Sequence, residues 1–433
     1  MKSVRDLTVF FLTLWCVLSL VHCVLADVAP GDRIDTTNAD KLQGLVPEPV
    51  LNWVKKGDFV VDIAVLKYNP QEFFTSHQLE SFKTNAGKYD LDNKDSIIEV
   101  KTASRPDTII GLPFPKIDPS DPKAAQKIMY NNHYMQYQLG NVALPFYGIS
   151  VNRNGLEREG LCDLIQMPLD GYPGARDIPN PDRVEKYTIV VARSPFDVAG
   201  TAVMLCRYLD ADKQDSTFGY IPAIRRVRRM SPANRSDSFL GSDFGMDDTN
   251  GYDGKISAFE WKVVAMQESL APFLGTEPAL LEPKEKGEWV TSRNISSVLY
   301  GYKKEGWTGA PWAPTNLVWV KRPMYRIEMR PKDPYYNYGL HHVWIDADSY
   351  LCNYKVIHDK SGKYWKTILL SGRAFKSADG KMRVMGLGDQ QAIDDRADHA
   401  SIIEDASPRN VWVIFADLDL NDFSLAGFQK YCK

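Results

Sequence analysis

Apolar and polar residues alternate in short runs through the second half of the chain, and turn residues separate these runs. Alternation with a period of two is typical of strands that bury one face. Residues 359–363 and 378–381 read as hairpin turns, the second with an Asp-Gly pair that tolerates positive φ. The pattern therefore predicts a large antiparallel sheet with strands at 186–192, 202–208, 218–228, 289–302, 317–330, 340–345, 351–357, 364–370, 382–385 and 410–415.

The first half of the chain has a mixed pattern. A helix is predicted with Asp121 as its N-cap and Pro122 as its first residue, and it carries an apolar stripe at Ala125, Ile128 and Met129. Prolines and glycines are concentrated in 166–183, which indicates a linker. We therefore expect two parts, an amino-terminal region over 27–183 and an antiparallel β domain over 184–433.

One segment, residues 257–266, fits two kinds of element. Ser257 and Glu260 have capping-box spacing and precede apolar residues at helical spacing, which predicts a helix. The same segment contains Trp-Lys-Val-Val-Ala at 261–265, which fits another strand. The sequence leaves both interpretations open.

The chain begins with a segment of a different character. Lys2 and Arg5 precede a long apolar run that ends at Ala26. This order is typical of a secretory signal peptide, which we place at residues 1–26. An uncleaved membrane anchor is the alternative, and lipidation at Cys23 is less well supported by the neighbouring residues. We therefore expect the protein to be exported.

Composition and charge describe an ordinary folded chain. Hydrophobic residues make up 44% and charged residues 25% of the 433 residues, which excludes collagen, disorder, a coiled coil and a multispan membrane protein. The formal net charge of -3 gives no electrostatic reason to expect nucleic acid as a partner. The aromatic content of 11% suits strands or a pocket with apolar walls.

Four cysteines remain after the predicted signal peptide. In an oxidising compartment an even set usually pairs, and the absence of a C-x-x-C spacing argues against thiol redox chemistry and a zinc knuckle. The spacing does not choose among the three pairings, and buried free thiols are the alternative to disulfides. The four residues are Cys162, Cys206, Cys352 and Cys432.

The densest charged feature of the sequence is an arginine run. Four arginines within 225–229 are followed by three aspartates within 243–248. On a strand, the first and last arginines would point to one face and the other two to the opposite face. One interpretation is a sheet edge on which the arginines are solvated and form ion pairs with the aspartates. The other is a site where guanidinium groups meet an anionic ligand headgroup.

Candidate metal and catalytic residues form no recognisable set. His341 and His342 face opposite ways on a strand, and Asp346 and Asp348 fall at a turn, so no metal site is predicted. Residues 248–259 resemble a calcium loop only loosely and read as a turn. No G-x-S-x-G, H-E-x-x-H or phosphate-binding glycine loop occurs. We therefore predict no enzyme activity, no cofactor and no metal.

Several segments carry a more specific signal. They are Gly-Leu-Pro-Phe-Pro-Lys-Ile-Asp-Pro at 111–119, Tyr-Ile-Pro-Ala-Ile-Arg-Arg-Val-Arg-Arg at 220–229, Gly-Ser-Asp at 241–243, Glu-Trp-Lys-Val-Val at 260–264, and Pro-Lys-Asp-Pro-Tyr-Tyr-Asn-Tyr-Gly at 331–339 with Trp-Ile-Asp at 344–346. On these segments the chain resembles a bacterial periplasmic family, a domain of unknown function that is similar to outer-membrane lipoprotein-sorting proteins. The resemblance spans nearly all of the chain after residue 26.

The resemblance implies an α+β fold like that of the LolA and LolB lipoprotein carriers. Such a fold is a large antiparallel half-barrel wrapped over plug helices, here with a mixed amino-terminal extension. The implied function is that of a periplasmic carrier or accessory protein, which holds a lipid or other hydrophobic small molecule and works beside an inner-membrane exporter and an outer-membrane protein. The ligand-binding residues expected from it are Tyr220, Arg225, Arg226, Arg228 and Arg229.

Two other functions stay open at this point. The same cavity would serve a sensor or interaction module of the envelope, which detects lipid and signals by contact. A secreted hydrolase is motivated only by His341, His342 and scattered carboxylates.

Overall fold

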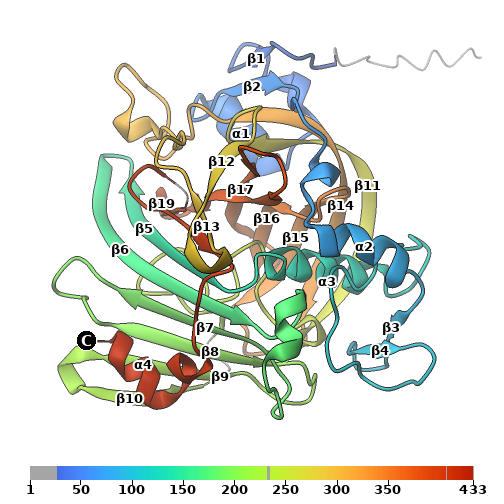
Figure 1. The fold of residues 1–433 in the computed structure, drawn as a ribbon. Helices are drawn as coiled ribbons and strands as arrows, with labels where there is room; N and C mark the ends of the chain where they lie inside the picture. The colour runs from blue at the N-terminus through green and yellow to red at the C-terminus, as the bar shows by residue number, and fades with distance from the viewer. Residues whose placement is uncertain (1–26, 232–234, 406, 433) are drawn as a thin grey trace, which may run out of the picture.

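The computed structural model describes residues 27–231, 235–405 and 407–432. The predicted signal peptide, residues 1–26, lies outside the described residues. The described chain forms one 18-stranded sheet, a separate two-stranded sheet and four α-helices (Figure 1). Within these ranges, no helix has both the length and the apolar character needed to cross a membrane.

The elements of the described chain have the following bounds. The helices are α1 (Glu48–Lys56), α2 (Ser76–Thr84), α3 (Ala124–Tyr137) and α4 (Leu425–Tyr431). The small sheet is β3 (Tyr89–Leu91) with β4 (Ile97–Glu99). The strands of the large sheet are β1 (Arg33–Ile34), β2 (Val61–Ala64), β5 (Val142–Asn152), β6 (Gly155–Pro168), β7 (Val184–Ala192), β8 (Ala202–Tyr208), β9 (Ser216–Ile221), β10 (Arg226–Met230), β11 (Phe259–Phe273), β12 (Ala279–Pro283), β13 (Trp289–Thr291), β14 (Val318–Pro331), β15 (Tyr338–Asp346), β16 (Cys352–Asp359), β17 (Tyr364–Ser377), β18 (Arg383–Asp394), β19 (His399–Glu404) and β20 (Val413–Ile414).

One antiparallel path runs through most of the large sheet. In order of pairing it passes through β10, β9, β8, β7, β6, β5, β19, β18, β17, β16, β15, β14 and β11. Parallel contacts join β2 to β14, β11 to β17 and β12 to β17, so the sheet is mixed. Because β11 pairs with β14 along its length and also meets β17 through Phe273 and Gly372, the sheet curves back on itself at this end.

The prediction of a large antiparallel sheet is confirmed for its central strands. The expected strands at 186–192, 202–208, 317–330, 340–345, 351–357 and 364–370 correspond to β7, β8, β14, β15, β16 and β17. Both predicted hairpin turns join neighbouring antiparallel strands, β16 to β17 and β17 to β18. The segment that fitted two kinds of element is a strand: β11 buries Phe259 and Trp261 and exposes Glu260 and Lys262.

Five predicted strands were wrong in their extent. The runs at 364–370 and 382–385 are too short, since β17 continues to Ser377 and β18 to Asp394. The run at 218–228 is a hairpin, because Pro222 begins a short 3-10 turn and Arg225 takes a positive φ of 48° between β9 and β10. The run at 289–302 contains only the three residues of β13, since a turn closed by the Ile295 N to Ser292 O hydrogen bond follows it. The run at 410–415 contributes only β20.

The sheet crosses the predicted boundary between residues 183 and 184. Strands β5 and β6 precede this boundary, yet β5 pairs with β19 and β6 pairs with β7. The expected linker at 166–183 is packed into the structure through Asp170, which is 2% exposed. Its carboxylate accepts hydrogen bonds from the Ile109 amide and the Tyr134 hydroxyl, each over 2.6 Å. The two predicted parts therefore share one sheet.

Helix α3 lies against one face of the sheet, where it packs on β11 and β18. The predicted apolar stripe of Ala125, Ile128 and Met129 is buried, as expected. The helix begins two residues later than predicted, because the Asp121 carboxylate accepts a hydrogen bond from the Lys123 amide in a turn that precedes it. In Figure 1, α2 and α3 lie on the same side of the molecule.

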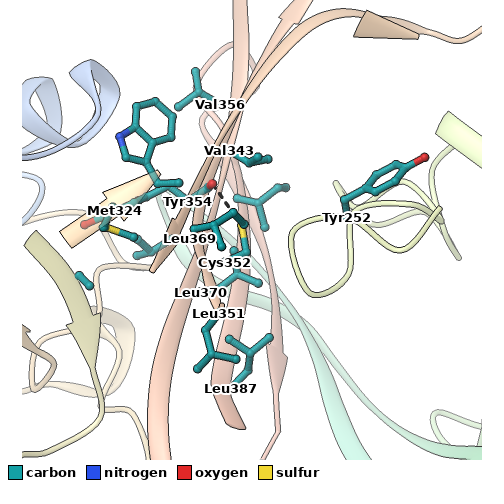
Figure 2. Close-up of a cluster of buried hydrophobic side chains, with 14 of the residues drawn as sticks. Tyr252, Met324, Val343, Leu351, Cys352, Tyr354, Val356, Leu369, Leu370 and Leu387 are labelled. Atoms are coloured by element: carbon teal, nitrogen blue, oxygen red, sulfur yellow. Dashed lines mark hydrogen bonds between the residues drawn. The ribbon is translucent and has the colours of Figure 1, made fainter. Parts of the chain in front are cut away.

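The largest apolar core surrounds β14 to β18. Figure 2 shows Met324 on one side of these strands and Tyr252 on the other, with Leu351, Cys352 and Leu387 between them. The segment that carries Tyr252 therefore covers one face of this part of the sheet.

The four cysteines are buried free thiols, so the disulfide interpretation is wrong. Cys352 and Cys162 belong to different apolar clusters, and Cys206 and Cys432 pack in a third cluster without a bond between them. Burial raises the pKa of Cys352 to about 12 and that of Cys162 to about 11, which favours the unreactive thiol form.

Candidate functional site

A cavity of about 710 Å³ lies between the sheet and the loop at 239–253. Its walls come from β5, β6, β7, β8 and β19, from the end of α3, and from that loop. We call it the main cavity. Its apolar wall is formed chiefly by Leu144, Phe146, Leu164, Val190, Val203 and Leu205.

The register of four strands builds this apolar wall. Leu144 on β5 pairs with Leu164 on β6, which pairs with Val190 on β7, which in turn pairs with Val203 on β8. Paired residues of neighbouring strands point to the same face of a sheet. Four aliphatic side chains therefore form one row across the wall, and a parallel row holds Phe146, Cys162 and Ala192.

The aliphatic row is only partly covered by the protein itself. Leu144, Leu164, Val190 and Val203 are all half-buried, although each belongs to the sheet and faces inward. Apolar side chains that line an open space of several hundred Å³ are typical of small-molecule sites. An apolar ligand would remove this surface from water and would be stabilised by that burial.

Polar side chains gather at another part of the main cavity. The Asn250 side-chain amide donates to Gln136 Oε1 over 2.7 Å, and the Asn250 backbone N–H donates to Gln390 Oε1 over 2.8 Å. Gln390 also donates to Asp405, whose pKa is held well above its usual range by burial and by the neighbouring Asp389. Gln136 Nε2 is buried without a hydrogen-bond partner among the described residues, so this donor is available to a ligand oxygen.

Asp243 fastens the loop to the edge of the main cavity. Its Oδ2 accepts a hydrogen bond from Ser401 Oγ over 2.9 Å and lies 2.6 Å from His399 Nδ1. The other ring nitrogen of His399 lies 3.1 Å from Glu157 Oε2. The hydrogen bond with Asp243 is the main cause of a raised pKa for His399. The Gly-Ser-Asp segment at 241–243 therefore fixes one wall of the cavity to β19.

A buried ion cluster that the sequence analysis missed lies beneath the same loop. Arg207 is 0% exposed, and its Nη1 donates to Asp253 Oδ1 over 2.7 Å. Lys186, its partner across β7 and β8, donates to the same carboxylate oxygen over 2.6 Å. Although burial opposes the shift, Lys186 and Arg207 lower the pKa of Asp253 well below its usual range. The sequence did carry a signal for this cluster, because Lys186 and Arg207 are charged residues at buried positions of alternating strands.

The predicted ligand-binding arginines lie on the exposed β9–β10 hairpin. Arg225, Arg226, Arg228 and Arg229 are all exposed, and none forms an ion pair with any residue that the structure describes. The prediction of a salt-bridged edge is therefore wrong for this part of the chain. The three nearby aspartates instead pair with other residues: Asp243 with His399, Asp247 with Arg235 and Asp248 with Lys355.

Two of the arginines and Tyr220 line a smaller cavity of about 460 Å³. This cavity adjoins the main cavity, because both are lined by Val203, Phe239, Leu240 and Met246. Arg228 and Arg229 belong to the lining of the smaller cavity, whereas Arg225 and Arg226 do not. The hairpin thus divides the predicted arginine cluster into two pairs with different surroundings.

The histidine pair does not form a joint site. His341 is 0% exposed among the rings of Phe259, Tyr336 and Tyr338, which places it out of reach of a substrate. His342 points to the opposite face of the sheet. Within the described ranges, no group of three or more His, Cys, Asp or Glu side chains is placed to hold a metal ion.

Comparison with known proteins gives a family but no named function. The chain is similar to a domain from Vibrio parahaemolyticus described as outer membrane lipoprotein-sorting, with 16% identity, a TM-score of 0.47, and coverage of 70% of this chain and 97% of that chain. It is also similar to a DUF1329 family protein from Desulfovibrio piger, with 15% identity, a TM-score of 0.46, and coverage of 71% and 99%.

A LolA superfamily protein from Nitrosomonas europaea is similar at 11% identity and a TM-score of 0.41, over 70% of this chain and 98% of that chain. No curated protein matches the sequence. The model of the DUF1329 family, described as a protein of unknown function, matches residues 33–402, which is most of the chain. The chain therefore belongs to the DUF1329 family.

Proposed function

We propose that this protein is a periplasmic carrier or accessory protein that binds a lipid or other hydrophobic small molecule in the main cavity. The observation that supports the proposal is the row of half-buried aliphatic side chains at Leu144, Leu164, Val190 and Val203. Each methylene of a ligand that is removed from water contributes about 0.8 kcal/mol. A single acyl chain in this cavity therefore binds usefully and still dissociates, as a carrier requires.

In this proposal the sheet acts as an incomplete barrel, and α3 with the loop at 239–253 acts as its plug. Residues of α3 and of this loop both line the main cavity. The predicted signal peptide supports a periplasmic location, and the proposed partners are an inner-membrane exporter and an outer-membrane protein. The ligand is bound without covalent chemistry.

The ligand that we propose has an anionic group as well as an apolar body. Arg228, Arg229 and Tyr220 line the smaller cavity that adjoins the apolar one. A guanidinium group matches the geometry of a phosphate or a carboxylate. A lipid whose chain fills the main cavity would therefore place its headgroup at this pair of arginines.

The arginine hairpin offers a matched comparison within one cluster. The double change Arg228→Gln and Arg229→Gln is expected to weaken capture of phosphatidylglycerol from vesicles at least about tenfold, because it removes two charges from the lining of the smaller cavity. The control is the double change Arg225→Gln and Arg226→Gln, which removes the same charge from residues outside that lining. Capture is measured by flotation of vesicles and extraction of the transferred lipid. Equal losses in the two variants would contradict a specific headgroup site.

The function itself is tested on protein purified from a bacterial periplasm. We expect native mass spectrometry to show one bound hydrophobic molecule per chain, which organic extraction then identifies. A protein that stays empty with every lipid offered would overturn the carrier proposal. Recovery of a stoichiometric protein partner without lipid would instead favour the sensor or interaction module.

A further inference from the structure

A second cavity lies on the other face of the sheet, away from the main cavity. It has a volume of about 980 Å³ and is bounded by α1 and by β14, β15, β16 and β17. The two cavities share no lining residue. Because side chains alternate along a strand, Arg326 and His342 point toward α1, whereas their neighbours Ile327 and Val343 point toward the side of α3. We call this space the α1 cleft.

The floor of the α1 cleft carries a guanidinium group that has no partner among the described residues. Arg326 is half-buried, and its side chain forms no hydrogen bond or ion pair with any residue in the described part of the chain. Its Nε is among the buried nitrogen atoms that lack an acceptor. Leaving a buried charged donor without an acceptor costs free energy, so such groups are normally paired. An anion in the cleft would satisfy this donor.

Two imidazole rings lie beside this arginine. The centroids of the His342 and His358 rings lie 6.0 Å apart. His358 Nδ1 is also buried and finds no hydrogen-bond partner within the described ranges. Burial lowers the pKa of His342, and the neighbouring Arg326 and His358 act in the same direction against Glu328. The three side chains therefore present donors to the cleft from three neighbouring strands.

Among the described residues no acidic group pairs with Arg326, whereas Glu328 Oε2 lies 3.7 Å from His342 Nε2. Asp395 accepts hydrogen bonds from Trp53 Nε1 over 2.8 Å and from the Tyr364 hydroxyl over 2.6 Å, so neutral donors already occupy it. Glu48 is exposed at the start of α1, and Lys56 is exposed near its end. Glu328 lies outside the lining and accepts a hydrogen bond from Arg330 over 2.9 Å.

The rest of the lining is aromatic and apolar. Trp344 pairs with Arg326 across β14 and β15, and Val356 pairs with His342 across β15 and β16. Trp53 and Leu51 face them from α1. Flat rings next to a cation favour a ligand that has both an anionic group and a flat apolar body.

We propose that the α1 cleft is a second ligand site, which binds an organic anion through Arg326, His342 and His358 and packs the flat body of that anion against Trp344. The anionic group is a carboxylate or a phosphate. This site is independent of the main cavity and of the lipid proposed to bind there.

The test measures binding of phenyl phosphate, benzoate and inorganic phosphate to the purified protein by isothermal titration calorimetry. We expect saturable binding of phenyl phosphate and benzoate, and at least about tenfold weaker binding of inorganic phosphate, which has no ring to pack. The change Arg326→Gln is expected to weaken phenyl phosphate at least about tenfold. The second variant is His358→Gln, which removes an imidazole ring from the cleft lining and is expected to weaken binding of phenyl phosphate several-fold. The fold should tolerate this change, because Nδ1 of that ring forms no hydrogen bond with the described residues.

The control is Arg293→Gln, which removes the charge of an exposed arginine outside the linings of the α1 cleft and of the main cavity. Its affinity for phenyl phosphate should stay within about twofold of the original protein. The proposal is overturned if none of the three probes binds with saturation, or if folded Arg326→Gln and His358→Gln both bind phenyl phosphate as the original protein does. If inorganic phosphate binds as tightly as phenyl phosphate, the proposed packing of a flat body against Trp344 is refuted. A loss of binding on Leu164→Glu would place the probe in the main cavity instead.

Discussion

The change Leu164→Glu is expected to reduce binding of a neutral hydrophobic probe, N-phenyl-1-naphthylamine, by at least about a hundredfold. Leu164 stands in the middle of the aliphatic row, between Leu144 and Val190. In the empty cavity water can solvate the new carboxylate, so the protein still folds. A bound apolar ligand would strip that water away, and burial of an unpaired charge costs several kcal/mol.

The control for this change is Leu156→Glu, on the same strand. Leu156 is 49% exposed and lies outside the cavity lining, so the same substitution there should leave the affinity for the probe within about twofold of its original value. Binding is followed by the fluorescence of the probe, and folding by circular dichroism. A folded Leu164→Glu variant with the original affinity would show that the probe does not occupy the main cavity.

The change Lys355→Met is expected to lower the free energy of unfolding by about 3–5 kcal/mol. Lys355 and Asp248 are both 0% exposed, and their charged atoms lie 2.6 Å apart. The same carboxylate also accepts hydrogen bonds from the Gly245 amide over 2.7 Å and the Tyr338 hydroxyl over 2.9 Å. Removing the lysine leaves a buried carboxylate whose nearest remaining cation, Lys366, lies 3.8 Å away.

This ion pair also makes the stability of the protein depend on pH. Although burial opposes the shift, Lys355 and Lys366 lower the pKa of Asp248 to about 2 from its ordinary 3.8. A group whose pKa is lower in the folded state adds stability above its unfolded pKa and loses it as the pH falls through the folded one. The stabilisation is therefore complete above about pH 4 and is lost between about pH 4 and pH 2, and Lys355→Met should flatten this part of the stability curve.

Urea unfolding at several pH values measures both effects. The control is Lys381→Met. The side chain of Lys381 is 84% exposed, and its ammonium group lies 3.3 Å from Asp379 Oδ2 in a hairpin turn. An exposed pair contributes at most about 1 kcal/mol, so the control should unfold close to the original protein. Equal losses of stability in the two variants would contradict the assignment of the buried pair as a structural anchor of the loop at 239–253.

Local patterns were enough for the elements that depend on neighbouring residues. The turn with Gly362 and the turn with Asp379 and Gly380 were predicted because glycine tolerates the positive φ that each turn needs, 81° at Gly362 and 71° at Gly380. The arginine run was predicted as one strand, because sequence alternation does not reveal that Pro222 and Arg225 form a turn. That turn decides which arginines share a cavity lining.

The candidate site was less accessible from the sequence. Its aliphatic row takes one residue from each of four strands, and only the pairing of β5, β6, β7 and β8 aligns Leu144, Leu164, Val190 and Val203. Strand β6 escaped prediction because Glu157, Arg158 and Glu159 lie near its start, and such a run of charged residues resembles a loop. Because β5 and β6 were not predicted, the cavity wall that they form could not be predicted either.

By itself, the sequence determined the period-two pattern, several turns, the near balance of charge and the resemblance to a family of unknown function, because each depends on residue type or on short spacing. Only the tertiary structure decided which charges are paired and which are not. Asp248 and Lys355 meet in the core, while Arg326 has no partner in the part of the chain that the structure describes, because strand register and the side on which each segment packs set these distances. The two cavities follow from the same cause, since they lie on opposite faces of one sheet whose side chains alternate.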